Sequence, residues 1–300
     1  MNLAFIGLGR MGGPMARHLA ATENQLRVYD VVPDAVARLT STHAGVGTAA
    51  NYADLVRDAD VVFASLPGPP DVEAVVLGPG GLRESMKPGS IYVDLTTNSP
   101  EMARKAAAGL AEKGSAMLDA PGSGGVEGAT AGTLGIMCGG DRATFDQVEG
   151  LLNVIGAKVV YCGGPGAGCV VKLCNNLASS SYGVILAEAL TLGVKAGVDL
   201  EVLASAIGAS TGASPRLNVH VRNYLFKRNF TPGFSTNLSA KDTRLGLELA
   251  QQYNVPMYVG EYLRNQTETA LERGWGDEDF DSIVKLQEER AGIELQIRDE

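Results

Sequence analysis

The sequence has few of the side chains that bind metals or form covalent cross-links. It contains three histidines and four cysteines: Cys138, Cys162, Cys169 and Cys174. No two cysteines form a Cys-x-x-Cys pair and no histidine cluster lies near them, so the sequence predicts neither a metal site nor a disulfide framework. The histidines His18, His43 and His220 fall in no recognisable motif. A histidine general base is therefore disfavoured.

Positive charge and long apolar runs are also scarce. The chain carries 25 Lys and Arg against 34 Asp and Glu, a net charge of -9, and no basic run of the kind that phosphate backbones require. It has no unbroken stretch of 18 apolar residues and no signal peptide pattern at its start. We therefore expect a protein that binds neither nucleic acid nor membrane, and we expect it in the cytoplasm.

Short apolar runs alternate with helical patterns through the first half of the chain. Such alternation predicts a doubly wound α/β sheet. The expected strands are Leu3–Ile6, Leu26–Tyr29, Val61–Ser65, Ile91–Leu95, Ala116–Asp119, Leu134–Cys138 and Val159–Tyr161. Because too few residues separate Asp119 from Leu134 for a helical crossover, we expect an antiparallel edge strand before Cys138.

The strands are expected to stop at about residue 163, where a glycine-rich turn follows. The length of 300 residues suits two domains, which we place at residues 1–163 and 164–300. The second is expected to be helical and to start with a long, apolar linking helix over about residues 168–196. Further expected helices are Leu200–Ile207, Lys241–Gln252, Pro256–Arg273 and Asp279–Ile297.

A glycine motif, Gly7-Leu8-Gly9-Arg10-Met11-Gly12, follows the first strand and opens a helical pattern. In this setting one glycine makes a tight turn, the second lets the backbone approach a pyrophosphate, and the third permits close helix–strand packing. Asp30, 18 residues after Gly12, ends the second strand, where an acid bonds the adenosine ribose and repels a 2′-phosphate. The motif predicts NAD as cofactor, with NADP disfavoured. Asp30 could instead only cap the next helix.

Four segments, in order and spacing, resemble the β-hydroxyacid dehydrogenase family, which includes 3-hydroxyisobutyrate dehydrogenase and tartronate semialdehyde reductase. They are the glycine motif extended to Ala16, Asp119–Gly125, Gly166–Asn176 and Lys241-Asp242. The resemblance covers nearly the whole chain. It implies a Rossmann dinucleotide-binding domain followed by an all-helical domain, and hydride transfer between NAD and the hydroxyl carbon of a small 3-hydroxy acid.

The resemblance also implies roles for particular residues. Lys172 would exchange a proton with the substrate hydroxyl, and Asn176 would orient the same oxygen. The two are four residues apart, so on a helix they share one face. Desolvation and a cationic nicotinamide would both disfavour the charged form of the lysine. Ser123, Gly124 and Gly125 suit a carboxylate, because a hydroxyl and adjacent amides without side chains can surround an anion.

Further cofactor contacts are expected at the carboxyl ends of two strands, where open α/β sheets bind ligands. These are Leu66, Pro67, Thr96 and Thr97. Asp71 fits a cofactor contact or, equally, an acid at a helix start. The resemblance implies that Lys241 reaches the nicotinamide from the helical domain; otherwise it would be a surface lysine paired with Asp242 or Glu248.

Several alternatives stay open on the sequence alone. An aldehyde- or imine-reducing relative shares this architecture, although retention of Lys172 argues against the imine case. A dinucleotide-binding module without catalysis would be expected to lack Lys172 or the Ser-Gly-Gly segment. The helical part is too short for a 6-phosphogluconate dehydrogenase. Gly122 replaces the valine usual in the family, which leaves the side-group preference open. The apolar linking helix needs cover, so we expect a homodimer or homotetramer.

Overall fold

The computed structural model describes residues 1–297 of the chain. It divides into two compact units, Met1–Lys172 and Leu173–Glu300. The strands were predicted to stop at about residue 163, and the last one ends at Gly163. The boundary between the two units lies after Lys172, inside the long helix that follows.

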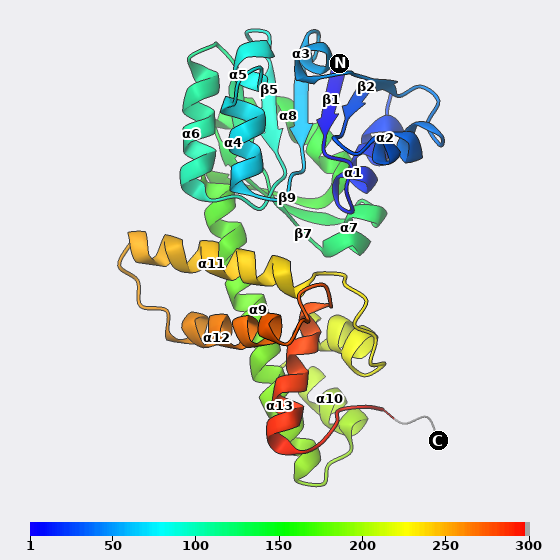
Figure 1. Cartoon of the computed structure of the whole chain (residues 1–300), viewed down its shortest axis with the longest axis vertical. Helices are drawn as coiled ribbons and strands as arrows, with labels where there is room; N and C mark the ends of the chain where they lie inside the picture. The colour runs from blue at the N-terminus through cyan, green and yellow to red at the C-terminus, as the bar shows by residue number, and fades with distance from the viewer. Residues whose placement is uncertain (298–300) are drawn as a thin grey trace. The chain divides into compact units, whose positions relative to one another are not determined.

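A nine-stranded sheet forms the centre of the first unit (Figure 1). Its strands are β1 (Asn2–Ile6), β2 (Gln25–Tyr29), β3 (Gly47–Thr48), β4 (Val61–Ala64), β5 (Ile91–Asp94), β6 (Ala116–Asp119), β7 (Gly122–Ser123), β8 (Leu134–Gly140) and β9 (Gly156–Gly163). The order is β3-β2-β1-β4-β5-β6-β8-β7, and β9 also pairs with β8. The first six strands are parallel, as a doubly wound fold requires.

Helices cover both faces of this sheet because successive strand residues point to opposite sides. Leu3 and Phe5 of β1 belong to one buried apolar cluster, whereas Ala4 and Ile6 belong to the other. The helices are α1 (Gly12–Ala20), α2 (Pro33–Thr40), α3 (Tyr52–Val56), α4 (Pro69–Leu77), α5 (Leu82–Ser85), α6 (Pro100–Ala111), α7 (Gly125–Ala131) and α8 (Arg142–Ile155). The predicted α/β architecture of this half is confirmed.

The strand before Cys138 is only partly as predicted. β8 runs antiparallel to β6, as its short connection requires, but it is not an edge because β9 pairs with it in parallel. The sequence also gave no sign of β3 and β7, which have two residues each. Such short strands carry no alternation from which they could be predicted.

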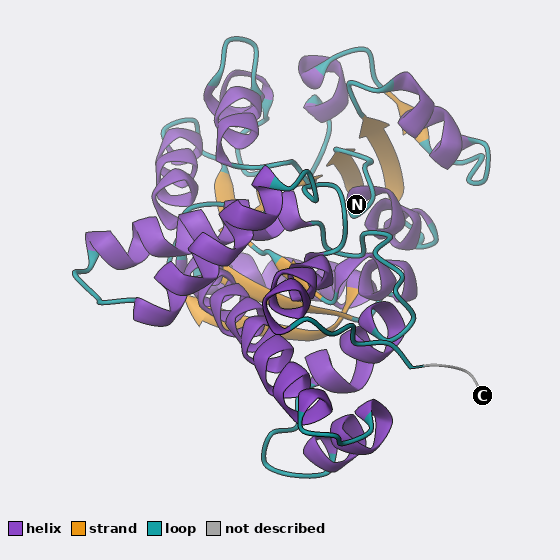
Figure 2. Ribbon diagram, turned by 60° about the horizontal axis from the view of Figure 1, so that its bottom comes forward, coloured by secondary structure: helices purple, strands orange, loops and turns teal. Residues whose placement is uncertain are grey.

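Beyond Lys172 the described residues form helices and loops (Figure 2). The elements are α9 (Ala167–Lys195), which begins in the first unit, α10 (Leu200–Gly208), the π-helix η1 (Arg216–Leu225), α11 (Thr236–Gln252), α12 (Tyr258–Glu272), the 3-10 helix η2 (Phe280–Ile283) and α13 (Val284–Ala291). Two apolar clusters form the core of this unit; Leu186 and Leu190 of α9 belong to one, and Leu177 belongs to the other. The predicted helical character of this half is confirmed.

Three features of the second unit differ from the prediction. α11 begins at Thr236 rather than Lys241, because the Ser235 hydroxyl accepts a hydrogen bond from the amide of Leu238 and caps the helix. The single helix expected over Asp279–Ile297 was wrong: a 3-10 turn precedes α13, and Gly292, with φ 65°, ends it. The π-helix over Arg216–Leu225 was not predicted.

The helix α9 is long and apolar enough to cross a membrane by length and composition alone. It has 29 residues, and an 18-residue window in it has a mean hydropathy of 1.4, with 39% of that window buried inside the structure. The same description fits a core helix of a soluble protein, and α9 contributes side chains to three of the four apolar cores.

Candidate active site

The three glycines of the first motif have different surroundings. Gly7 has φ 86°, and a side chain there would place Cβ 2.2 Å from the carbonyl oxygen of Ser65. A Cβ on Gly12 would lie 1.8 Å from the carbonyl oxygen of Gly7, so only glycine lets α1 begin so close to the turn. Gly9 has nothing within 4 Å of its Cβ position. The loop therefore leaves an open approach to backbone amides at Gly9, which fits a dinucleotide pyrophosphate.

The Asp30 carboxylate joins the glycine loop to the end of β2. Its Oδ2 accepts a hydrogen bond from the amide of Leu8 at 2.6 Å, and its Oδ1 accepts one from the amide of Val32 at 2.7 Å, beside the start of α2. A carboxylate has about four acceptor positions, so both bonds leave capacity for ribose hydroxyls. The next two residues, Val31 and Val32, are exposed and uncharged, and neither offers a cation for a 2′-phosphate.

The expected contacts at the ends of β4 and β5 lie side by side. The Thr96 hydroxyl accepts a hydrogen bond from the amide of Leu66 at 3.0 Å, which links the two strand ends. Pro67 and Thr97 follow these residues directly. Asp71 lies in the first turn of α4, where a helix-start acid would stand.

Two buried carboxylates lie at the ends of neighbouring strands, Asp94 on β5 and Asp119 on β6. The sequence analysis did not name Asp94, and it named Asp119 only as the end of a strand and the start of one of the four segments. Asp94 accepts hydrogen bonds from the amide of Thr96 and from Nδ2 of Asn98, at 3.1 and 3.0 Å. Burial raises the pKa of Asp94 to about 6, although the hydrogen bonds from Thr96 and Asn98 oppose the rise. Asp119, its neighbour in register on β6, is also buried, and burial raises its pKa against the hydrogen bonds from Cys169 and Gly166.

The segment expected to bind a carboxylate forms a turn between β7 and α7. Ser123 ends β7, and Gly124 and Gly125 follow with φ 133° and 62°. Two successive positive φ angles turn backbone amides in directions that other residues rarely allow. At Gly122, where the family usually has valine, a Cβ would lie 3.2 Å from Cδ1 of Leu134.

Lys172 and Asn176 lie one turn apart on α9, and both are almost fully buried, with 8% and 9% of their surfaces exposed. The amide of Asn176 is held on both sides. Its Nδ2 donates to Oδ2 of Asp242 at 2.6 Å, and its Oδ1 accepts from Nδ2 of Asn175 at 3.1 Å. Its orientation is therefore fixed by neighbours in its own unit.

Lys241 lies beside Asp242 on α11, with its Nζ 3.3 Å from Oδ1 of Asp242. The other partner considered for Lys241, Glu248, pairs with Arg244. The side chain of Asp242 is 5% exposed, so this carboxylate is shared between Lys241 and Asn176 in a buried position. The sequence analysis treated Asp242 only as a partner of Lys241. The adjacent Lys-Asp pair was the available signal, but a bond to a residue 66 positions away leaves no local pattern.

Within residues 1–297, no three or more His, Cys, Asp or Glu side chains are grouped so that they could hold a metal ion.

Two family models match the chain almost end to end. Residues 2–164 match the NAD binding domain of 6-phosphogluconate dehydrogenase. Residues 166–287 match the NAD-binding domain of NADP-dependent 3-hydroxyisobutyrate dehydrogenase.

Individual relatives agree with these matches. The chain is 36% identical over 295 residues to 2-(hydroxymethyl)glutarate dehydrogenase of Eubacterium barkeri, covering 98% of this chain and 97% of that one. It is 37% identical over 297 residues to the NAD-dependent L-serine dehydrogenase of Pseudomonas aeruginosa, covering 97% and 99%. Among solved structures, the 3-hydroxyisobutyrate dehydrogenase of Mycobacterium tuberculosis with L-serine superposes with a TM-score of 0.86 at 30% identity, over 95% of this chain and 98% of that one.

These relatives are dehydrogenases of small hydroxy acids, and the matches span both halves of the chain together with the glycine loop and the α9 residues described above. The chain therefore belongs to the β-hydroxyacid dehydrogenase family and is an NAD-dependent hydroxyacid oxidoreductase.

Proposed function

We propose that this enzyme oxidises the primary alcohol of acids of the form HOCH2–CHR–COO⁻. The names of the three relatives above give substrates of this form: R is a carboxyethyl group in 2-(hydroxymethyl)glutarate, an amino group in L-serine and a methyl group in 3-hydroxyisobutyrate. The shared part is the hydroxymethyl group one carbon away from a carboxylate. We infer that this part is recognised here and that the pocket around R decides among substrates.

The residues of the first unit fit NAD, as the open approach at Gly9 and the spare acceptor capacity of Asp30 indicate. Under this proposal the amides of the Gly7–Gly12 loop hold the pyrophosphate and Asp30 holds the adenosine ribose. Leu66, Pro67, Thr96 and Thr97 line the site at the strand ends, with Asp71 and Lys241 as further candidate contacts. When bound, NAD supplies the acceptor for the hydride that leaves the alcohol carbon.

Lys172 is the proposed proton acceptor. As its neutral amine, it takes the proton of the substrate hydroxyl. At the same time a C–H bond of the carbon that carries this hydroxyl breaks, and the product is the aldehyde. In the reverse direction its ammonium returns the proton. Asn176 donates its second Nδ2 hydrogen to the substrate oxygen, since the first is committed to Asp242.

Ser123, Gly124 and Gly125 are the proposed carboxylate site. The Ser123 hydroxyl and the amides of the two glycines offer donors without charge, which suits a carboxylate that must also leave as product. A carboxylate held here fixes the distance of the hydroxymethyl carbon from the turn. Holding two reactants, here the acid and NAD, in a fixed orientation accounts for a large part of catalysis.

The observation that carries the proposal is the pair of nearly buried side chains, Lys172 and Asn176, on one face of α9, with the amide fixed by Asp242. NADH formation should be measured with acids in which R is hydrogen, methyl, amino or carboxyethyl, and with 2-hydroxy acids for comparison. Turnover of at least one acid of the proposed form, well above that of any 2-hydroxy acid, is expected. Faster turnover of a 2-hydroxy acid would overturn the proposal.

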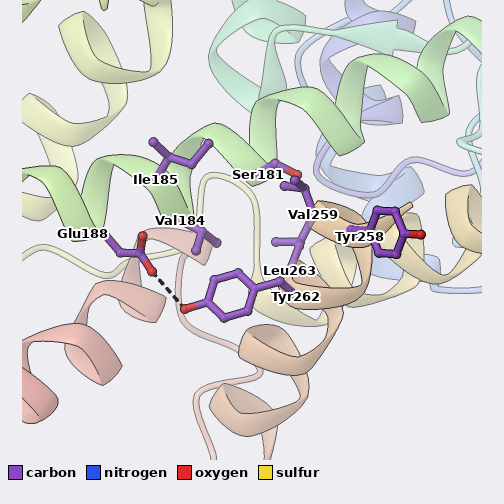
Figure 3. A pocket seen from close by; sticks show the side chains of 8 residues that line it. All are labelled: Ser181, Val184, Ile185, Glu188, Tyr258, Val259, Tyr262 and Leu263. Carbon is purple, nitrogen blue, oxygen red and sulfur yellow. Dashed lines mark hydrogen bonds between the residues drawn. The ribbon is translucent and has the colours of Figure 1, made fainter. Parts of the chain in front are cut away.

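We further propose that the enzyme works as a homodimer or homotetramer in which α9 lies at the interface. Support comes from a groove of about 280 Å³ between α9 and α12 (Figure 3). It is lined by Ser181, Val184, Ile185, Glu188, Tyr258, Val259, Tyr262 and Leu263. Ile185 is 50% exposed, and Leu192 further along α9 is 72% exposed. Light scattering should find an oligomer at micromolar concentration, and Ile185→Glu should shift it toward monomer; a monomeric unaltered chain would contradict this proposal.

A further inference from the structure

His18 connects two helices: α1, which follows the glycine loop, and α7, which follows the Ser123-Gly124-Gly125 turn. It lies in the second half of α1, and its Nε2 is 3.1 Å from the carbonyl oxygen of Ala129 and 3.0 Å from that of Thr130. Both oxygens belong to the last turn of α7. Carbonyl oxygens only accept hydrogen bonds, so Nε2 carries the proton and is shared between them.

The ring fits closely against the end of α7. Gly132, which has φ 69°, caps the end of α7, and a Cβ there would lie 3.2 to 3.5 Å from three atoms of the His18 ring. The last carbonyls of a helix have no partner within the helix, so donors from outside fix its end. His18 supplies such a donor from α1, and Ala129 packs in the same apolar cluster as Met15 and Leu19 of α1.

The other end of α7 is not fixed by a side-chain cap. Its N-terminal flanking residue is Gly124, and α7 has seven residues, too few to be stable without tertiary contacts. Ser123, Gly124 and Gly125 stand at that uncapped end. The turn is thus held on one side by the pairing of Ser123 with Gly135 of β8, and on the other side through α7, whose last turn is held by His18.

We propose that His18 is a positioning residue for the substrate: its hydrogen bonds to the end of α7 hold the Ser123-Gly124-Gly125 turn at a fixed distance from the nucleotide-binding helix α1. The inference rests on the proposed carboxylate site. Loss of the donor lets α7 and its turn shift while the glycine loop, at the other end of α1, keeps its own hydrogen bonds from the amide of Leu8 to Asp30 and from the amide of Gly7 to the carbonyl oxygen of Tyr29.

The test uses variants that differ in where they place a donor. His18→Leu keeps the bulk and removes the N–H. Gln places its amide nitrogen near the position of Nε2, whereas Asn places it near Nδ1, so His18→Gln should restore function and His18→Asn should not. His43→Leu, in the loop before β3, is the matched control, since the side chain of His43 bonds only its neighbour Thr42 among the contacts described.

The full-length enzyme should be assayed for KM and kcat with its best hydroxy acid and for NAD affinity in the absence of acid. We expect His18→Leu and His18→Asn to raise KM for the acid about tenfold, with NAD affinity within about twofold of the unaltered enzyme. His18→Gln and His43→Leu should stay close to it. An unchanged KM in His18→Leu, a parallel loss of acid and NAD binding, or equal behaviour of the Gln and Asn variants would overturn the inference.

Two further measurements separate this inference from the proposed function. Ser123→Ala should raise KM for the acid; if it does not, the carboxylate site is wrong, whereas an effect of Ser123→Ala without one of His18→Leu removes only the role of His18. Amide hydrogen exchange at residues 122–126 needs no substrate and should be faster in His18→Leu than in His43→Leu. If His18→Leu fails to fold, the Gln and Asn variants are compared instead, by KM for the acid and by amide hydrogen exchange at residues 122–126.

Discussion

The carboxylate of Asp119, at the end of β6, accepts a hydrogen bond of 2.8 Å from the amide of Cys169 in the first turn of α9. Its other oxygen accepts one of the same length from the amide of Gly166. Asp119 thus caps the helix that carries Lys172 three residues later, from a strand about 50 residues earlier in the chain. A side chain at the end of β6 therefore fixes the start of α9.

Replacing this cap should weaken the fold. Asp119→Ala leaves two buried amides without an acceptor, and we expect a loss of about 1–3 kcal/mol in the free energy of unfolding. Urea denaturation measures it. Asp146→Ala, which removes a carboxylate from an exposed pair with Arg142 on α8, is the control and should change stability little. Equal stabilities of the two variants would show that the cap contributes nothing.

The buried carboxylate of Asp94 should make stability depend on pH. Its pKa is raised by burial to about 6, so the folded chain holds this proton more tightly than the unfolded chain, in which the pKa is near 3.8. The stabilisation from protonated Asp94 is full below about pH 4 and is lost as pH rises through about 6. Asp94→Asn does not titrate.

The measurement is the difference in unfolding free energy between the unaltered chain and Asp94→Asn, followed from about pH 4 to about pH 7.5. The unaltered chain should lose stability relative to the variant, by on the order of a few kcal/mol. The difference between the two proteins isolates Asp94 from carboxylates such as Asp54 and Asp60, whose pKa values are lowered by hydrogen bonds and which act in the opposite sense. A constant difference across this range would contradict the assignment.

Lys172→Ala should lose turnover while keeping its cofactor. General acid–base groups contribute about 10²- to 10⁴-fold in rate, so kcat should fall by that range or more, with NAD affinity unchanged. Oxidation by the unaltered enzyme should quicken as pH rises, because only the neutral amine accepts a proton. Lys195→Ala, at the far end of the same helix, is the control. Near-native kcat in Lys172→Ala would remove the proposed mechanism.

Asn176 and Asp242 should behave as one unit. In a double-mutant cycle with Asn176→Ala and Asp242→Ala, the effects on kcat/KM should be non-additive by about 0.5–3 kcal/mol, as is usual for residues in direct contact. A second cycle pairs Asn176→Ala with Glu248→Ala, which lies in an exposed pair on α11. Additive effects are expected there. Additivity in the first cycle would mean that Asp242 does not orient the amide.

Asp30 should set the preference for NAD over NADP. Asp30→Ser removes the charge that repels a 2′-phosphate and also a bond to the glycine loop. We expect kcat/KM with NAD to fall, so that the ratio of kcat/KM with NAD to kcat/KM with NADP decreases. The control is Asp34→Ser, at an exposed acid at the start of α2, which should leave kcat/KM with either cofactor unchanged. Steady-state kinetics with both cofactors decides it; a larger kcat/KM with NADP for the unaltered enzyme would contradict the preference.

The parts of the molecule that sequence reasoning found are those with a local pattern. The glycine loop, the buried strands and α9 are each specified by neighbouring residues, and all were predicted. The cap on α9 by Asp119 and the bond from Asn176 to Asp242 join residues 50 and 66 positions apart, so no window of sequence contains both partners. The π-helix over Arg216–Leu225 was not predicted, because the pattern of apolar residues does not distinguish a π-helix from an α-helix or a turn.

Gly9 and Gly12 are the same residue type for different reasons, and this difference bears on how such a chain would change over generations. A side chain at position 12 collides with the backbone oxygen of Gly7, so the fold itself excludes it whether or not NAD is present. Position 9 has free space around it and is restricted only by what must lie against it. In a lineage that lost dinucleotide binding, substitutions should therefore accumulate at Gly9 while Gly12 is kept. A relative with a side chain at position 9 and glycine at position 12 would be a folded protein that no longer binds the cofactor, whereas a side chain at position 12 would indicate a disturbed fold.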